Sequence, residues 1–276
     1  AGRRRPDAGA DLAALAKLLA DAGDAVACVL VQSPNYLGVL QDLSAIQSLA
    51  HKAGALTVVA CPEPLAFGLV KSPGSQGADI VAGEGIGLAS GPSLGGPGVG
   101  LFAARSEHVR QIPGRLVGET VDQDGRRGYV LTLSTREQHI RREKATSNIC
   151  TNQGLIALAF AIHLCMLGKS GFRRLAEINL AKSEYLKQRL AAVRGFRLAV
   201  SGPTFNELAV TVRGRAADAA QRLRERGIFA GVPLDQPGFE LPSLPDAERT
   251  LLIASNERHR KADLDRLVTA LDEVCP

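Results

Sequence analysis

Residues 25–60 read AVACVLVQSPNYLGVLQDLSAIQSLAHKAGALTVVA, and this stretch predicts the fold. It opens with a continuous apolar run at 25–31, which is typical of a strand covered on both faces. Pro34 and Asn35 follow, and these residue types favour a turn at the carboxyl end of a strand. Apolar residues then recur at helical spacing over 43–53, and 55–60 is a second apolar run. Strand, helix and strand in this order predict parallel strands in a βαβ unit.

The pattern continues on both sides of this unit. We expect a helix at 11–22, ended by Gly23, and further strands at 78–82 and 100–104. Together these elements predict an α/β protein with a mostly parallel sheet. Sheets of this kind place ligands beyond the carboxyl ends of their strands.

The second half of the chain predicts a different arrangement. Two long helices are expected, followed by a smaller α+β unit with its own core. The helices are expected at 147–167, 173–193, 216–226 and 261–274, and the strands at 196–200, 206–212 and 249–254. We therefore expect a partial large domain over 1–150, and a linking helix with a small carboxyl-terminal domain over 151–276.

Composition narrows the class of protein. The chain has 276 residues, 45% of them hydrophobic and 22% charged, as in an ordinary globular protein. The net charge is +5, the basic residues are spread among acidic ones, and aromatic residues make up only 4% of the chain. A nucleic-acid binder needs a clustered basic stripe. An anionic small substrate or an acidic protein partner suits this balance better.

The cysteines and histidines give no sign of a metal site. The five cysteines are scattered and form no CxxC pair, which is typical of thiols in a reducing compartment. Most histidines, including His51, His108 and His163, lack ligand-like spacing. The longest apolar stretch, 154–167, is too short to cross a bilayer, and no signal segment opens the sequence. We therefore expect a cytoplasmic protein without a membrane span.

Residues 135–153, TREQHIRREKATSNICTNQ, concentrate polar chemistry directly before an apolar helix. The arginines could clamp a carboxylate or phosphate, and His139 could act as a general base. Salt bridges with Glu137 and Glu143 are an alternative role for these side chains. Cys150 stands at the head of the helix, where a thiolate is stabilised, although a small packed thiol is the simpler interpretation. The candidate site residues of the segment are Arg136, His139, Arg141, Thr146, Asn148 and Cys150.

A second candidate is the loop at 83–100, GEGIGLASGPSLGGPGVG, which contains eight glycines. Such loops let backbone N–H groups approach a phosphate. No GK[ST] follows and a strand comes next, so neither a nucleotide P-loop nor a dinucleotide fingerprint is present. Gly95, Gly96 and Gly98 are the candidate cofactor-binding residues. The alternative is a tight loop that packs near another chain.

Four motifs together resemble the glycine cleavage system P-protein family. They are SPNYLG (33–38), LGGPG (94–98), PGRLVG (113–118) and the polar segment 135–153. The chain is most similar to subunit 1, the amino-terminal half of glycine dehydrogenase (decarboxylating), from about residue 11 to the carboxyl end. The family's amino-terminal portion, roughly the first third of a full subunit 1, is expected to be missing.

The resemblance implies the type I fold of pyridoxal phosphate (PLP) enzymes. It also implies a reaction in which glycine is decarboxylated and its aminomethyl group passes to the lipoyl arm of the H-protein. In this family, subunit 1 pairs with a PLP-carrying subunit 2 in a heterotetramer. The polar segment and the glycine-rich loop are then expected to face a shared active-site region or the subunit interface.

The chain lacks both residues that anchor PLP in this fold. The position of the Schiff-base lysine falls near Ile86, and no lysine occurs between Lys71 and Lys144. The strand expected to end in an aspartate ends in Ala60 and Cys61 instead. We therefore expect PLP on the partner subunit. A self-sufficient PLP enzyme of the aminotransferase kind and a non-catalytic remnant are the alternatives.

Overall fold

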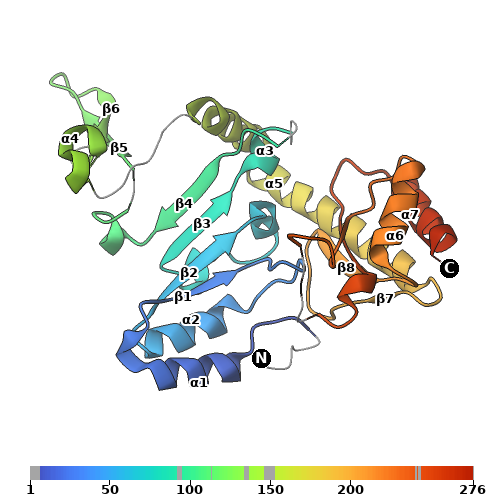
Figure 1. Ribbon diagram of the computed structural model, residues 1–276. Helices are drawn as coiled ribbons and strands as arrows, with labels where there is room; N and C mark the ends of the chain where they lie inside the picture. Colours follow the sequence, from blue (N-terminus) through green and yellow to red (C-terminus); the bar gives the residue numbers. More distant parts are fainter. Residues whose placement is uncertain are drawn as a thin grey trace.

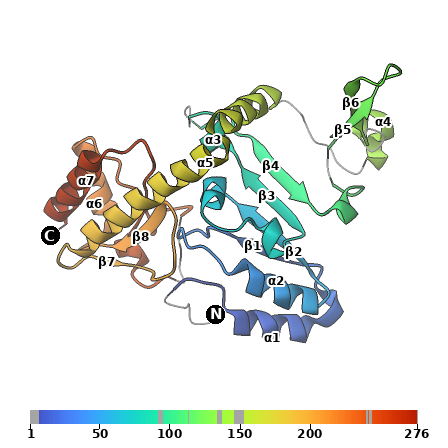
Figure 2. The same cartoon turned by 180° about the vertical axis from the view of Figure 1, so that it is seen from behind.

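The computed structural model describes residues 7–91, 95–112, 114–133, 137–145, 153–239, 241 and 244–275. Figures 1 and 2 show a sheet unit built by the first half of the chain, a projecting hairpin, and a second sheet covered by helices. The long helix α5 runs between the two sheet units.

The first sheet has the strand order β1-β2-β3-β4. Its strands are β1 (Cys28–Gln32), β2 (Leu56–Cys61), β3 (Ile80–Glu84) and β4 (Gly100–Ala104). Strands β1, β2 and β3 are parallel to one another, and β4 is antiparallel to β3. The mostly parallel sheet expected from the sequence is confirmed.

Two helices cover one side of this sheet. They are α1 (Leu12–Ala22) and α2 (Leu43–Lys52), and the side chains of Asp11 and Asp42 cap their first turns. Leu43 packs with Val59 and Ala78 in a small core beneath the strands. Since α1 packs on α2 rather than on the opposite side, the helical cover lies on this face (Figure 1).

The other side of the sheet is open. The register aligns Leu30 with Val58 and Ile80, so these side chains share one face, and Leu30 is 70% exposed. The expectation that the run at 25–31 is covered on both faces is therefore wrong for the described residues. The physical reason is that α1 and α2 lie on the same side, and no described helix covers Leu30 on the other.

A two-stranded hairpin, β5 (Leu116–Val121) with β6 (Arg127–Thr132), projects from the sheet unit beside the short helix α4 (Gln138–Arg141) (Figure 1). The sequence pattern did not predict it. Val117 is 65% exposed and Tyr129 61% exposed. A lone hairpin is marginal in water, because two strands bury too little apolar surface.

Helix α5 (Gly154–Ala191) replaces the two separate helices expected from the sequence. Gly168 interrupts it with φ 60° and ψ −175°, which marks a kink near the expected break. The expected start of the first helix, 147–152, lies outside the described residues. By length and composition α5 could cross a membrane: the mean hydropathy of its most apolar 18-residue window is 1.7, and none of that window is buried. The apolar run at 154–167 is therefore part of a longer helix than expected.

The second sheet has the order β7-β8-β10-β9 and is antiparallel. Its strands are β7 (Arg197–Leu198), β8 (Glu207–Thr211), β9 (Val232–Pro233) and β10 (Thr250–Ala254), and its helices are α6 (Ala216–Glu225) and α7 (Lys261–Val274). Strand β9 was not expected, because two residues give no periodic signal. The other elements match the expected ranges within a few residues.

Candidate functional site

The loop after β1 contains the SPNYLG motif and links the two sheets. The side-chain oxygen of Asn35 accepts the N–H groups of Leu37 and Val39, each at 3.0 Å. Val39 forms a β-bridge with Thr204. Gly38 has φ +77°, and a Cβ there would stand 2.5 Å from the carbonyl oxygen of Glu207. The motif therefore fixes where the first sheet meets the second.

The loop after β2 brings a carboxylate to the same junction. Glu63 follows the buried Cys61, and its Oε1 accepts the N–H of Leu65 at 3.1 Å. Its Oε2 accepts the side-chain N–H of Asn206 at 2.9 Å, which ties β2 to the start of β8. Burial raises the pKa of the Cys61 thiol to about 11, so this thiol stays protonated near neutrality.

Three glutamates gather at this junction, and we call them the glutamate cluster: Glu63, Glu207 and Glu257. Burial raises the pKa of Glu63, and the charge of Glu257 adds to that rise. The pKa of Glu207 is also raised, first by burial and then by the charge of Glu63. Carboxyl groups with raised pKa values can hold or transfer a proton closer to neutrality than free ones.

The third member of the cluster is held from α5. The side-chain N–H of Asn179 donates to Glu257 Oε2 at 3.1 Å and to the carbonyl of Leu175 at 2.9 Å. Lys182 donates to the backbone carbonyl of Glu257. These residues could not be found from the sequence, because they come from four distant segments. The one available signal was the place of Glu63, directly after a parallel strand.

The loop after β3 is the beginning of the glycine-rich segment. Glu84 Oε1 accepts the N–H groups of Ile86 at 2.8 Å and Val99 at 3.0 Å, which closes the loop on itself. A Cβ at Gly98 would stand 2.9 Å from the Glu84 carboxylate. Gly98 therefore leaves room for this carboxylate, whereas Gly95 and Gly96 have nothing within 4 Å of a Cβ.

A cavity of about 530 Å³ opens between this loop, α5 and the segment after β10. It is lined by Gly87 to Gly91 of the loop and α3 (Ile86–Ala89), by His163, and by Asn256 to His259. His163 Nδ1 lies 2.7 Å from the carbonyl oxygen of Leu88. Because a carbonyl only accepts, Nδ1 carries a proton in this contact. The cavity has the volume of a small-molecule site.

The residues of the polar segment lie elsewhere. His139 and Arg141 are exposed on α4, which stands beside the projecting hairpin and away from α3 in both views (Figures 1 and 2). Arg136, Thr146, Asn148 and Cys150 lie outside the described residues. The structure therefore does not bring His139 and Arg141 together with Gly95, Gly96 and Gly98 within this chain.

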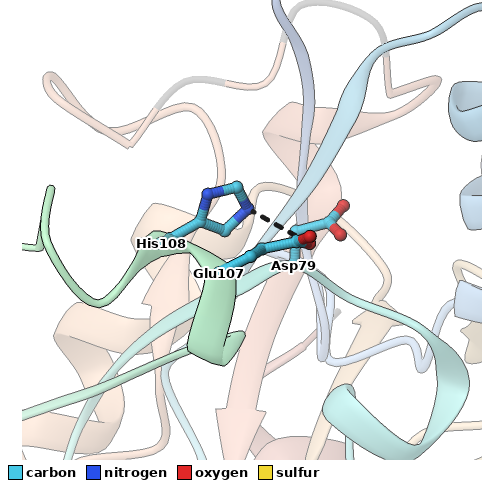
Figure 3. Close-up of side chains that lie close together, drawn as sticks. All are labelled: Asp79, Glu107 and His108. Carbon is cyan, nitrogen blue, oxygen red and sulfur yellow. Dashed lines mark ion pairs between the residues drawn. The ribbon is translucent and has the colours of Figure 1, made fainter.

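A different group of ligand-type side chains lies at the amino end of β3. One oxygen or nitrogen from each of Asp79, Glu107 and His108 falls within 4.8 Å of the others (Figure 3). The spacing of histidines in the sequence did not indicate it. Arg105 already lies between the acids, with Nε 3.2 Å from Asp79 Oδ1 and Nη1 3.9 Å from Glu107 Oε1. A guanidinium thus supplies the positive charge that a metal ion would bring.

Asp79 is a structural hub instead. Its Oδ2 accepts the N–H of Thr57 at 2.7 Å and faces His51 Nε2 at 2.8 Å. Burial alone would raise its pKa, but the Thr57 N–H, His51 and Arg105 together lower it. The carboxylate therefore stays charged and joins β3 to β2 and to the end of α2.

The site does not fit PLP held through a Schiff base by this chain. At the position expected for the Schiff-base lysine, α3 has Ile86 followed by Gly87. A Cβ at Gly87 would meet nothing within 4 Å. Where the acidic anchor is expected, β2 ends in Cys61, whose raised pKa keeps it neutral. The residues at these two positions therefore cannot anchor PLP.

Curated relatives share the sequence over nearly the whole chain. A probable glycine dehydrogenase (decarboxylating) subunit 1 of Rhodospirillum rubrum is 52% identical over 264 residues, which are 96% of this chain and 58% of that protein. A probable subunit 1 of Sorangium cellulosum is 49% identical over 275 residues, which are 98% of this chain and 58% of that protein. The chain thus spans somewhat more than half the length of the relatives it matches.

Solved structures agree on the fold. A crystal structure of glycine decarboxylase (P-protein) of the glycine cleavage system, in inhibitor-bound form, superposes with a TM-score of 0.83 at 42% identity, over 91% of this chain and 56% of that one. A NifS-like protein from Rickettsia africae superposes with a TM-score of 0.67 at 17% identity, over 98% of this chain and 68% of that one. At this level of identity the similarity shows the fold alone. The fold is the type I fold of PLP enzymes. The model of the glycine cleavage system P-protein matches residues 11–271, and the chain belongs to this family.

Proposed function

We propose that this chain is subunit 1 of glycine dehydrogenase (decarboxylating) in the glycine cleavage system. With a subunit 2 that carries PLP, it decarboxylates glycine and passes the aminomethyl group to the lipoyl group of the H-protein. The observation that carries this proposal is 52% identity with a protein named as subunit 1, in a chain without a lysine where the cofactor would attach.

The same proposal covers assembly and location. The two subunits form a heterotetramer, and the complex works in the cytoplasm without nucleic acid or membrane. Residues 1–150 form the partial large domain, and 151–276 form the linking helix and the small domain. The glutamate cluster and the cavity beside Gly87 then lie on this chain's side of the shared active-site region.

Within that assembly, the polar segment and the glycine-rich loop take part jointly with the partner. Arg136, His139, Arg141, Thr146, Asn148 and Cys150 supply polar groups, and Gly95, Gly96 and Gly98 let the backbone approach a ligand. The exposure of His139 and Arg141 in this chain supports this division, because both are free to meet another subunit.

Co-expression with a subunit 2 tests the function. Glycine-dependent CO2 release, measured with PLP and lipoylated H-protein, is expected from the co-purified pair and not from this chain alone. An absorbance scan of this chain with added PLP is expected to show no Schiff-base band. A band removed by one Lys→Ala change would favour the self-sufficient enzyme. Failure of the two subunits to associate would favour the non-catalytic remnant.

A matched pair of arginines tests the polar segment. Arg141→Ala is expected to lower CO2 release by the pair by about tenfold, the scale of a lost charged contact. Arg126→Ala is the control, because Arg126 is also exposed, lies beside β6 of the hairpin, and its side chain forms an ion pair with Asp124. Equal activity of both variants would remove Arg141 from the shared site.

A further inference from the structure

The cavity beside Gly87 carries one positive and one negative side chain of its own. It has a volume of about 530 Å³ and lies where α3 packs against α5 and faces the loop after β10, residues 256–259. Figures 1 and 2 show α3 beside the first half of α5 in both views. Glu257 and Arg258 are neighbours in the loop after β10, and both line the cavity. A cavity of this volume accepts a small molecule.

Within the part of the chain that the structure describes, these two charges have no ionic partner. No ion pair joins Glu257 to Arg258, and none joins either of them to another described residue. Both side chains are exposed to the solvent that fills the cavity. Two opposite charges that line one cavity and do not neutralise each other are complementary to a ligand that carries both charges.

The carboxylate of Glu257 is held in place from α5. The side-chain N–H of Asn179 donates to Glu257 Oε2 at 3.1 Å, and Lys182 donates to the backbone carbonyl of Glu257. The hydrogen bond from Asn179 uses Oε2, so Oε1 can accept from an ammonium group. A charged group that is already ordered loses little conformational entropy when a ligand binds.

The loop around Arg258 is ordered by its own hydrogen bonds. The backbone N–H of Arg258 donates to Asn256 Oδ1 at 3.1 Å, and the N–H of Asn256 donates to His259 Nδ1 at 3.1 Å. Because Nδ1 of His259 accepts, its Nε2 carries the ring proton and is a donor. The loop therefore provides a guanidinium and a ring N–H, the kinds of donor that bind a carboxylate.

The opposite wall of the cavity leaves space for the ligand. Gly87 and Gly91 both line it, and a Cβ on either glycine would meet nothing within 4 Å. The backbone of the glycine-rich loop is thus open to a bound molecule. A ligand with negative charge alone, such as phosphate, would be repelled by Glu257, whereas an added ammonium group turns this carboxylate into a binding partner.

We infer that the cavity beside Gly87 is a binding site for a free α-amino acid in its zwitterionic form. The ammonium group binds to Glu257, and the carboxylate binds to Arg258. The binding needs neither PLP nor subunit 2, so it goes beyond the proposed function, in which glycine reacts on the PLP of the partner. For a ligand of few atoms such as glycine, a Kd on the order of 1 mM is expected.

Equilibrium dialysis of this chain with radiolabelled glycine tests the inference, with acetate and methylamine as competitors that carry one charge each. Glycine is expected to bind at least about tenfold more tightly than either competitor, because only glycine meets both charges. Glu257→Gln keeps an oxygen for Asn179 and is expected to weaken glycine by about tenfold without weakening acetate. Arg258→Gln is expected to weaken both glycine and acetate by about tenfold.

The controls separate the cavity from the rest of the surface. Arg224→Gln removes an exposed arginine of α6 outside the cavity, and its glycine affinity should stay within about twofold of the unchanged chain. Gly87→Leu fills the cavity and is expected to weaken glycine by about tenfold. Gly74→Leu, at an exposed glycine with the same open space, should leave the affinity unchanged. Circular dichroism checks that each variant is folded.

Three results would overturn the inference. The first is acetate that binds as tightly as glycine, and the second is glycine binding that neither Glu257→Gln nor Arg258→Gln weakens. The third is inorganic phosphate that displaces glycine at a lower concentration than acetate does, which would make the cavity an anion site. Activity is measured separately: CO2 release by the co-purified pair, without glycine binding to this chain alone, would overturn this inference and keep the proposed function. An inactive pair with a chain that binds glycine would do the reverse.

Discussion

Strands β1 and β8 have similar apolar sequences and opposite surroundings. On β8, Leu208 and Val210 pack into a core with α6 and α7, while Ala209 on the other side packs with Leu37 and Val39. On β1, the inner residues meet α2, and Leu30 on the other side is 70% exposed. An apolar strand thus favours cover on both faces, and the rest of the chain determines whether that cover is present.

The comparison extends to the whole of each sheet. The second sheet has α6 and α7 on one side and a cluster that includes Leu37 and Val39 on the other, so its core is closed. The first sheet has helices on one side only. We therefore expect substitutions of the same kind to have unequal effects in the two sheets.

The largest effect is expected from Leu251→Ala in β10. Leu251 is fully buried at the centre of the second sheet. Removing a buried leucine side chain leaves a cavity and costs about 3 kcal/mol of unfolding free energy. Native-state hydrogen exchange should show faster exchange along β8 and β10. Unchanged exchange there would mean that the second sheet is not the closed unit described here.

Asp79→Ala is expected to cost about 2 kcal/mol, because it leaves the buried N–H of Thr57 without its acceptor and frees His51 and Arg105. The lowered pKa of Asp79 adds a pH signature. Its stabilisation is present above the ordinary carboxyl pKa and is lost as the pH falls through the lowered value. Urea unfolding at several pH values should show a weaker acid limb in the variant, and the exposed Asp24→Ala should keep the wild-type profile.

Glu63→Gln is expected to stabilise the protein at neutral pH by about 1 kcal/mol. Because burial raises the pKa of Glu63, the folded state holds this proton more tightly than the unfolded state. That contribution is full below the ordinary carboxyl pKa and is lost as the pH rises through the raised value. The amide cannot ionise, so the gain should appear at pH 8 and vanish at pH 4 in urea unfolding.

The exposed Glu119→Gln on β5 is the control for Glu63, since it makes the same change in charge without burial. If both variants gained equally, the effect would come from net charge and not from the glutamate cluster. A loss of stability in Glu63→Gln at pH 8 would show that the Asn206 contact outweighs the cost of burial.

The smallest effect is expected from Leu30→Ser in this chain alone. Because Leu30 is 70% exposed, the change should alter the unfolding free energy by less than about 0.5 kcal/mol. Thermal unfolding beside Leu251→Ala measures the contrast directly. A cost above about 2 kcal/mol would mean that the face of Leu30 is covered in solution.

Much of the fold could be predicted from local patterns. The alternation of apolar runs and helical spacing over 25–60 predicted β1, α2 and β2, because parallel strands are apolar and connecting helices are amphipathic. The segments 216–226 and 261–274 matched α6 and α7 for the same reason. The hairpin β5–β6 and the two-residue strand β9 were not predicted, because their residues show no strong periodicity.

The candidate site was harder to predict from the sequence than the fold. The turn at Pro34 and Asn35 and the loop that contains Gly98 could be placed at strand ends from sequence. The glutamate cluster could not, because Glu63, Glu207 and Glu257 come from three segments of the chain that are far apart in sequence. Their raised pKa values come from burial at a junction that exists only after the two sheets meet.

The sequence by itself determined the family, the order of most strands and helices, and the lack of a lysine for PLP, because these depend on residue identity and local spacing. Only the tertiary structure decided that Asp79 joins β2 to β3, that three glutamates share one junction, and that one sheet face is open. Burial depends on which segments come together in space, and the open face shows that an apolar strand alone does not determine its cover.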